Sequence, residues 1–270
     1  MSGAESLQTF RSSELLLSDC PVASLPRANY DHATLTMGDG TVLSCGGTTT
    51  SCLQLSPDMA SWTSHSSLPS SFSHSNLVSS VLPSGAYLMG RNTGAYLPTG
   101  SFQWKSFHIP PDHDARSSCS VAISSTSFLL IGGFYEQGDF VDEYESLTGE
   151  WTRWPQRMPE RREGMACVKV GGIVLLTGGY NRALNEYDGA TVILDLETKA
   201  WRRGGDMTWA RDGHGVSVLG SGRVLAYGGS YYGDDGAEEW SMETETWTPI
   251  EDRMDVERSR FGSSVVSVIC

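Results

Sequence analysis

The chain has no long hydrophobic run, and it has few basic residues and few cysteines for a length of 270 residues. No stretch is long and apolar enough to predict a membrane-spanning helix, so we expect no insertion into a membrane. The first ten residues also lack the basic start and apolar core of a secretory signal. We therefore expect either an intracellular protein, in the cytoplasm, or an extracellular chain whose true N-terminus is missing.

Basic residues are outnumbered, since 19 Lys and Arg stand against 32 Asp and Glu and give a formal charge of -13. Affinity for nucleic acid depends on clustered Lys and Arg, so the sequence predicts no nucleic-acid partner. A basic or neutral protein partner fits this charge better. The charge also fits a simpler role in keeping the protein soluble.

Six cysteines are too few for a disulfide scaffold in a chain of this length. Cys45 lies just before a glycine pair and Cys52 opens the next predicted strand, so the two can face each other across a strand pair. In an oxidising compartment they are the candidate disulfide. In a reducing compartment both are small buried hydrophobic residues, which the lack of a signal peptide favours.

Motifs of nucleophilic, metal and phosphate chemistry are missing, including Gly-x-Ser-x-Gly, Cys-x-x-Cys, His-Glu-x-x-His and a Walker-type loop. His32 and His214 both lie 14 residues before a glycine pair, where Ser118 and Gly164 hold the equivalent places. A metal site needs several ligands close together, and Ser and Gly interrupt this set. We therefore predict hydrogen bonding within turns, with no metal and no other cofactor.

Glycine is abundant, with 30 residues, and it recurs in pairs at the ends of short apolar runs. Because glycine freely allows positive φ, each pair predicts a buried strand that turns sharply. Met89-Gly90 is a degraded copy of the same feature, and we expect the unit around it to be flatter or less well packed. The recurrence identifies a repeat. The intact pairs are Gly46-Gly47, Gly132-Gly133, Gly178-Gly179 and Gly228-Gly229.

Two further landmarks recur with the glycines. A Trp follows each one, and a large apolar residue stands seven positions before that Trp, as Tyr144 does before Trp151. A Leu, Ile or Met comes next, often with Pro and then Arg, as in Met158-Pro159. Each unit therefore reads as four short strands, with the Trp opening the fourth. The tryptophans are Trp62, Trp104, Trp151, Trp201 and Trp247.

This combination resembles the kelch repeat over essentially the whole chain, and the copies running into Gly132-Gly133 and Gly178-Gly179 carry it best. The resemblance implies an all-β fold, a six-bladed β-propeller with four antiparallel strands per blade. We expect one domain over 1–270, with the sixth blade shared between the termini or incomplete. The expected blades are 28–69, 70–110, 111–159, 160–208, 209–255, and 256–270 together with 1–27.

The loops after the glycine pairs should emerge at one face, since they occupy the same place in successive blades. They are rich in Tyr and acidic residues, which suit protein contacts because Tyr offers a large area with few rotatable bonds. The plainer alternative is that the tyrosines pack onto neighbouring loops. The candidate partner-binding residues are Tyr135, Glu136, Asp139, Tyr180, Asn181, Arg182, Tyr231, Tyr232, Asp234 and Asp235.

We therefore expect a non-catalytic, monomeric interaction scaffold that binds a protein partner through these loops. One alternative is a sugar enzyme similar to the mutarotases among kelch-like propellers, with Arg161, Arg211 and Glu163 in its channel. A copper oxidase would need a Tyr and His set that does not align here. A second alternative is a fragment of a larger secreted protein. An Asp234/Asp235 calcium site lacks the spacing of a binding loop.

Overall fold

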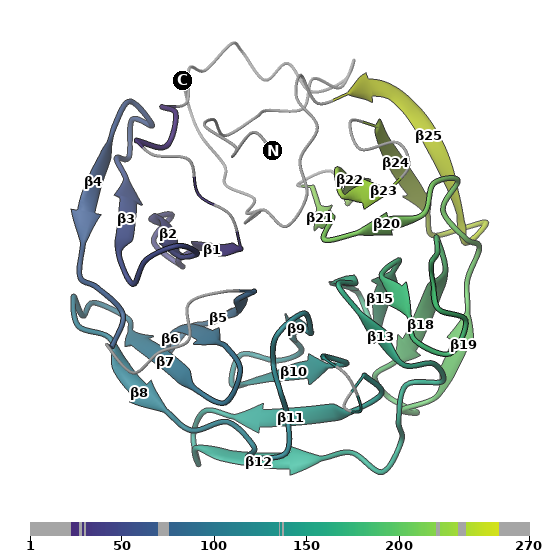
Figure 1. The fold of residues 1–270 in the computed structure, drawn as a ribbon, viewed down its shortest axis with the longest axis horizontal. Helices are drawn as coiled ribbons and strands as arrows, with labels where there is room; N and C mark the ends of the chain where they lie inside the picture. The colour runs from purple at the N-terminus through teal and green to yellow at the C-terminus, as the bar shows by residue number, and fades with distance from the viewer. Residues whose placement is uncertain are drawn as a thin grey trace.

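The structure is a computed structural model that describes residues 23–26, 29, 31–69, 76–134, 136, 138–219, 222–231 and 236–253. Its regular elements are short β-strands, most of them in four-stranded antiparallel sheets. Figure 1 shows these sheets following one another in chain order around a common centre. Among the described residues, no helix is long and apolar enough to cross a membrane.

The first two sheets are simple meanders in which each strand pairs with the next. One consists of β1 (His32–Thr36), β2 (Val42–Gly46), β3 (Cys52–Leu55) and β4 (Trp62–His65). The next consists of β5 (Val78–Leu82), β6 (Gly85–Met89), β7 (Gly94–Pro98) and β8 (Lys105–Phe107). The second sheet is fully formed, and Ala86, Leu88 and Met89 have no exposed surface. The expectation of a poorly packed unit around Met89-Gly90 is therefore wrong.

Three further sheets repeat the pattern. One consists of β9 (Cys119–Ala122), β10 (Ser127–Ile131), β11 (Val141–Glu145) and β12 (Glu150–Arg153). The next consists of β14 (Ala166–Val170), β15 (Ile173–Thr177), β18 (Thr191–Asp195) and β19 (Trp201–Arg203). The last consists of β21 (Gly215–Val218), β22 (Val224–Tyr227), β24 (Gly236–Ser241) and β25 (Thr246–Arg253).

Small sheets form where the connections between four-stranded sheets cross the long loops. β13 (Arg162–Glu163) pairs with β16 (Tyr180–Asn181), which in turn pairs with β17 (Glu186–Tyr187). β20 (Arg211–Asp212) pairs in the same way with β23 (Ser230–Tyr231). The architecture is thus all-β, with antiparallel sheets of the kind that form propeller blades, and we call the four-stranded sheets blades 1 to 5.

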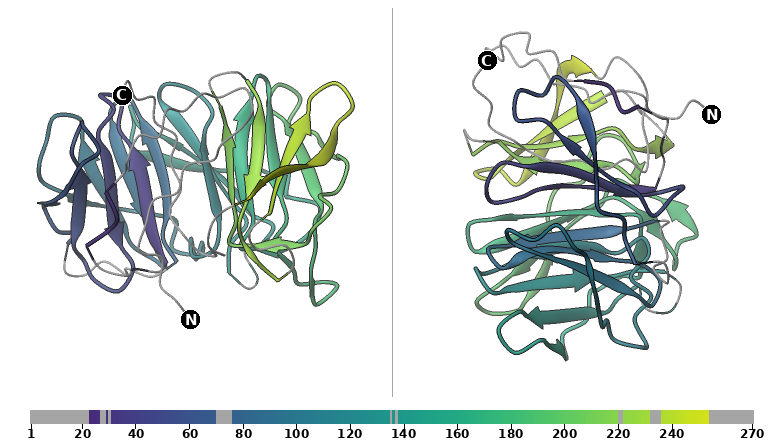
Figure 2. Two further views of the ribbon diagram at one scale, coloured as in Figure 1. Left: turned by 90° about the horizontal axis from the view of Figure 1, so that it is seen from above. Right: turned by 90° about the vertical axis from the view of Figure 1, so that its left-hand side faces the viewer.

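In each blade the first strand lies nearest the common centre and the fourth lies outermost (Figure 1). First strands of neighbouring blades contact one another, as β9 contacts both β5 and β14. Because the strands alternate in direction, the turns fall on two faces, seen edge-on in Figure 2. We call the corner face the one that carries the glycine pairs, the loops after them and the connections between blades. The opposite face carries the other turns.

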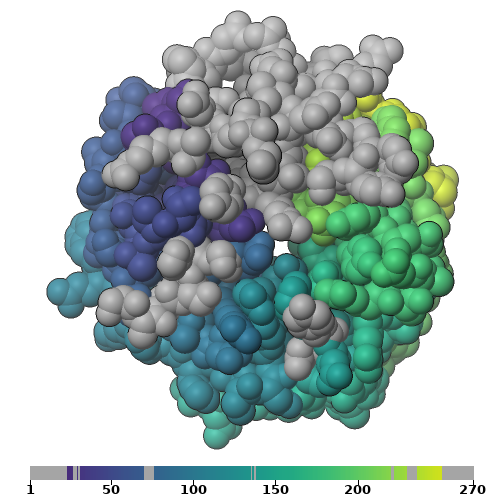
Figure 3. Space-filling view, in the orientation of Figure 1, coloured from purple at the N-terminus to yellow at the C-terminus, as the bar shows by residue number. Residues whose placement is uncertain are grey.

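The hydrophobic core is divided into clusters that lie between successive blades. One cluster joins Leu129 and Ile131 of blade 3 to Val174 and Leu176 of blade 4, and similar clusters fill the other junctions. Figure 3 shows the result, a continuous array in which neighbouring blades touch along their sides. A single blade would expose these apolar faces to water, so each blade depends on its neighbours.

The seven-residue spacing before each Trp has a direct structural meaning. Tyr144 lies opposite Trp151 in the β11–β12 pair, as Trp240 lies opposite Trp247 in β24–β25. The Trp151 indole N–H donates to the His108 carbonyl at 2.8 Å, in the connection from blade 2. Trp151 therefore joins its own third strand to the preceding blade.

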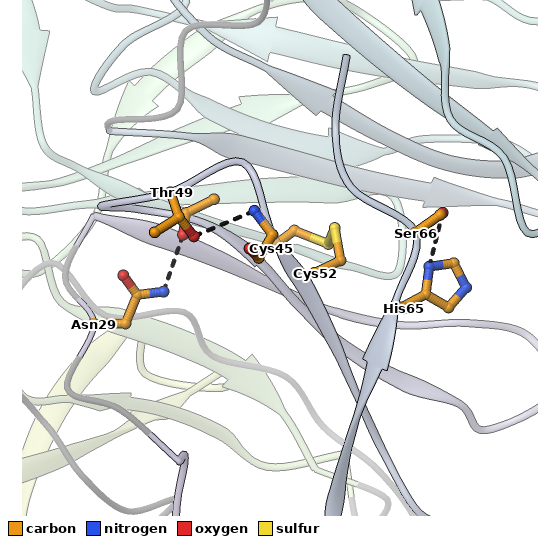
Figure 4. Close-up of a disulfide and its surroundings, with 8 residues drawn as sticks. Asn29, Cys45, Thr49, Cys52, His65 and Ser66 are labelled. Carbon is orange, nitrogen blue, oxygen red and sulfur yellow. Dashed lines mark hydrogen bonds between the residues drawn. A yellow bond between two sulfur atoms is a disulfide. The ribbon is translucent and has the colours of Figure 1, made fainter. Parts of the chain in front are cut away.

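Within the part of the chain that the structure describes, one disulfide lies inside a blade and another joins two blades. Cys45 and Cys52 are directly opposed in the β2–β3 pair and are bonded to each other (Figure 4). Cys119 of β9 is bonded to Cys167 of β14, which ties blade 3 to blade 4 near the centre. The pair that the sequence offered as the candidate disulfide is thus bonded in the structure, and the alternative of two separate thiols is not what it shows. The second bridge was not anticipated, because its partners lie 48 residues apart in sequence.

Candidate functional site

The glycine pairs form tight corners on the corner face. All eight glycines of the intact pairs have positive φ, for example +60° at Gly178 and +91° at Gly179. A Cβ atom on Gly178 would lie 2.5 Å from the Arg211 carbonyl oxygen, and one on Gly179 would lie 2.6 Å from that of Glu163. Glycine is needed here both for its backbone conformation and for the close approach of neighbouring connections.

At each described corner, a polar side chain of the preceding connection donates a hydrogen bond to the carbonyl of the first glycine, and the Gly132 carbonyl also accepts from the Ser118 hydroxyl at 2.9 Å. Each of these connecting side chains stands four residues after the Leu, Ile or Met landmark of the preceding connection. The donors are Asn29 to Gly46 at 3.0 Å, His113 to Gly132 at 2.7 Å, Arg162 to Gly178 at 3.2 Å and Arg211 to Gly228 at 2.6 Å. Figure 4 shows Asn29 on the corner side of the Cys45–Cys52 disulfide, with His65 and Ser66 beyond it.

The same connecting residues also bridge successive blades. The Arg211 carbonyl accepts from the backbone N–H of Gly179 at 2.7 Å, whereas its guanidinium group reaches Gly228 in the next blade. Arg162 repeats this arrangement between Gly133 and Gly178. Sequence reasoning singled out Arg161, one position away from the buried donor. The constant offset of four residues is the signal that would have identified Arg162.

Arg211 has no exposed surface. Its guanidinium group lies 3.5 Å from the carboxylate of Glu238, which is equally buried. Arg161 and Glu163 lie on the corner face rather than in a common pocket, and Glu163 is paired with Arg182 at 2.8 Å. Arg161, Arg211 and Glu163, the candidate residues of the alternative sugar enzyme, thus each form an ion pair within the protein.

The buried histidines also have structural positions. Burial lowers the pKa of His32 to about 4, and burial together with the nearby Arg211 charge lowers that of His214 to about 3. The Nε2 atom of His214 lies 2.7 Å from the Thr177 hydroxyl of the preceding blade. Within the described ranges, no group of three His, Cys, Asp or Glu residues is placed to hold a metal ion.

His113 takes the place that arginine holds in the next two connections, and it is fully buried. Its Nε2 atom faces the Gly132 carbonyl, and its Nδ1 atom lies 2.5 Å from the Asp142 carboxylate. The imidazole ring thus lies between the Gly132 carbonyl oxygen and the Asp142 carboxylate. Burial opposes the ionisation of Asp142, but hydrogen bonds from His113 and Arg153 outweigh it and lower the pKa of this carboxyl.

A shallow cavity of about 480 Å³ lies beside this network, at the outer junction of blades 2 and 3. Trp151, Pro110 and Pro111 form its apolar wall, and Asp112 and Arg153 form its polar wall. Arg153 holds Asp112 at 2.6 Å and Asp142 at 2.8 Å. Both carboxylates of this cavity, those of Asp112 and Asp142, are therefore paired with Arg153.

The predicted partner-binding loop of blade 3 emerges on the corner face. Glu136 is exposed, whereas Asp139 is partly buried and pairs with Arg157 at 3.1 Å and with Arg161 at 3.8 Å. The loop begins at Phe134, whose ring lies beneath two guanidinium groups, at 4.6 Å from Arg116 and 5.7 Å from Arg182. This loop is thus held by arginines of both neighbouring connections.

The loop of blade 4 is a protruding hairpin formed by β16 and β17. Asn181 is 1% exposed, and its side chain accepts from the backbone of Ala183 at the turn, so it supports the hairpin rather than a partner. Tyr180 packs edge-on against Tyr187 with ring centroids 5.0 Å apart. The tip carries Leu184, which is 61% exposed. Leu184 is neither a tyrosine nor an acidic residue, so the pattern that marked the candidate contact residues does not include it.

The blade 5 loop is described only at its start. Tyr231 lies in β23, where its backbone pairs with Arg211. Tyr135, Tyr232, Asp234 and Asp235 fall outside the described residues. Of the expected contact residues, the structure therefore brings together those of blades 3 and 4, through β13 and the arginines around Phe134.

Comparison with known families gives one match, in which residues 161–208 correspond to the kelch motif. These residues run from the connection before blade 4, through its four strands, to Met207 of the next connection. The resemblance drawn from the sequence is thus confirmed for this stretch. A comparison with curated protein sequences gives no significant match.

Proposed function

We propose that this protein is a non-catalytic interaction module that binds a protein partner on its corner face. The observation that supports this most directly is the β16–β17 hairpin, which carries Leu184 at 61% exposure on a braced support. An isolated exposed leucine is ordinary on a protein surface. This one differs because β13, the buried Asn181 and the edge-on pair of Tyr180 and Tyr187 support the hairpin. A preorganised apolar tip loses little entropy on binding.

The proposal includes a closed six-bladed ring, with the sixth blade drawn from 256–270 together with 1–27. Its support is the Asn29 side chain, which reaches the Gly46 carbonyl as Arg162 and Arg211 reach theirs. The segment before blade 1 thus behaves like a connection between two blades. A ring would hold the corner-face loops at fixed distances and present them as one surface.

The test compares photo-crosslinking from two exposed leucines on opposite faces. A crosslinking amino acid replaces Leu184, or Leu147 as the matched control, which is 81% exposed at the β11–β12 turn. We expect the same discrete protein to be crosslinked from position 184 and not from position 147. The proposal fails if both positions give the same products, or if neither gives one while the protein converts members of a sugar panel.

A further inference from the structure

The fourth strand of blade 3, β12, has a free edge. It pairs with β11 on one side only and is the outermost strand of its blade (Figure 1). The Trp154 N–H donates to the Val141 carbonyl, so the antiparallel pattern turns the backbone N–H and C=O groups of Trp151 and Arg153 away from β11. In the part of the chain that the structure describes, these outward groups have no hydrogen-bond partner. An edge of this kind is a template for one more strand.

The free edge lies beside the cavity at the outer junction of blades 2 and 3. Trp151 and Arg153, whose backbone groups point outward, also line this cavity. Its apolar wall consists of Trp151, Pro110 and Pro111, and its two carboxylates are already paired with Arg153. A volume of about 480 Å³ leaves room for an apolar side chain of a strand that is added at this edge.

The other face of the same two strands is acidic. Side chains alternate between the faces of a sheet, so the neighbours of Trp151 and Arg153 in β12 face away from the cavity. On that face Glu145 lies directly opposite Glu150, and Glu143 is the next β11 residue on the same side. Like charges that oppose each other destabilise a strand pair. Within the described ranges, no Lys or Arg forms an ion pair with these three glutamates.

One lysine of blade 4 lies close to the inner end of this acidic face. The Lys199 ammonium group is 4.1 Å from the centroid of the Trp154 ring, and the indole N–H of Trp154 donates to Glu143 at 2.9 Å. Glu145 accepts from two neutral groups, a hydroxyl and a backbone N–H, and Glu150 is exposed. The outer end of the face, at Glu145 and Glu150, is therefore negatively charged.

We propose that β12 binds an extended segment of a partner protein in which apolar and basic residues alternate. The segment would add a strand to blade 3 through main-chain hydrogen bonds to Trp151 and Arg153. Alternation then places its apolar side chains toward the cavity and its Lys or Arg side chains beside Glu145 and Glu150. The proposed corner-face site is centred on the hairpin of blade 4, so this inference goes beyond the proposed function and does not rest on it.

A second copy of this chain fits the edge less well. Antiparallel pairing of two β12 strands in one continuous sheet would bring the glutamates of both copies onto the same face. The formal charge of -13 adds a general repulsion between copies. A basic segment of a different protein instead offsets the repulsion between Glu145 and Glu150.

The experiment measures binding of a fluorescent peptide of alternating Val and Lys to the full chain. We expect an affinity about tenfold lower in Glu145→Gln/Glu150→Gln, because two exposed ion pairs with the peptide are lost. Glu197→Gln/Glu243→Gln is the matched control, since it removes the same charge from exposed turns of blades 4 and 5. The same peptide with methylated backbone nitrogens keeps its charges but cannot donate to a strand edge, so it should not bind.

Absence of binding by the alternating peptide would overturn the inference, as would equal loss in the two double variants. Equally tight binding of the methylated peptide, or of a peptide with Val and Lys in separate blocks, would overturn it because charge alone would then be recognised. A dimer of the chain that the peptide dissociates would assign the edge to a second copy, which also overturns it. Circular dichroism of each variant shows whether the fold is kept. The crosslinking test at position 184 involves another blade, so either proposal can fail alone.

Discussion

Single side chains decide how each described corner is closed. A positive φ at both glycines turns a backbone carbonyl toward the connection, where it would be buried without a partner. Asn29, His113, Arg162 and Arg211 supply that partner from equivalent positions. A buried carbonyl without a hydrogen bond costs about 1–3 kcal/mol, so the stability of each corner depends on its donor. Amide, imidazole and guanidinium groups all suffice, because the requirement is one N–H at the right place.

Replacement of Arg211 by Met should be severely destabilising. The change leaves the Gly228 carbonyl and the buried Glu238 carboxylate without their cationic donor. Removing one partner of a buried ion pair costs about 3–5 kcal/mol. Urea unfolding measures the loss, with Arg202→Met as the control, since Arg202 pairs with Glu245 on the surface. A surface change of that kind should stay within about 0.5 kcal/mol. Equal stability of the two variants would contradict the assigned role of Arg211.

Blades are the elements of this fold, and the stabilising contacts run between them. Four apolar clusters, the Cys119–Cys167 disulfide and the indole N–H bonds of Trp151 and Trp247 join neighbouring blades. An isolated blade has too little core of its own, since its two apolar faces are covered only by the blades beside it. Stability at this scale is therefore a property of junctions rather than of sheets.

Trp151→Ala should weaken the junction of blades 2 and 3. The indole packs on Phe107, Phe128 and Tyr144, and its N–H reaches the His108 carbonyl. Loss of a packed tryptophan costs about 3–5 kcal/mol. Thermal unfolding followed by tyrosine and tryptophan fluorescence measures the change, with Leu147→Ala as the exposed control. A melting temperature within a degree or two of the parent would show that the junction does not depend on Trp151.

Charge is distributed unevenly over the whole molecule. The chain is strongly acidic, yet Arg157 and Arg161 are more exposed than the Asp139 carboxylate with which both pair. Two histidines, His32 and His214, are buried near the centre. Burial lowers the pKa of His32 and of His214, so both are neutral in the folded protein at neutral pH. Unfolding releases them to water, where their pKa returns to about 6.5.

Stability should therefore fall as the pH falls from about 6.5 toward 4. In this window the unfolded chain binds protons at His32 and His214 that the folded chain does not, so acid favours unfolding. Each histidine contributes a slope of up to about 1.4 kcal/mol per pH unit, and above pH 6.5 its contribution is constant. Urea unfolding at several pH values measures the slope. His214→Gln should reduce it, and an unchanged slope would contradict the burial of a neutral imidazole.

The sequence by itself determined the repeat, the four strands of each unit and the place of the loops after the glycines. These follow from periodicity, because Tyr144 and Trp151 must oppose each other if seven residues separate them across a short turn. The kelch motif at 161–208 confirms that part of the interpretation. Likewise, Cys45 and Cys52 were identified as neighbours because local spacing predicts local pairing.

Only the tertiary structure decided which partners distant residues have. Cys119 meets Cys167 because the first strands of neighbouring blades lie side by side. His113 reaches the Gly132 carbonyl because its connection passes that corner as the connections of Arg162 and Arg211 pass theirs. The packing of connections also decides that Arg157 and Arg161 are more exposed than Asp139, with which both pair. A sequence gives the net charge of a loop, but whether Asp139 or Arg161 faces the solvent depends on how two connections pack. That packing makes the corner face arginine-rich on an acidic protein.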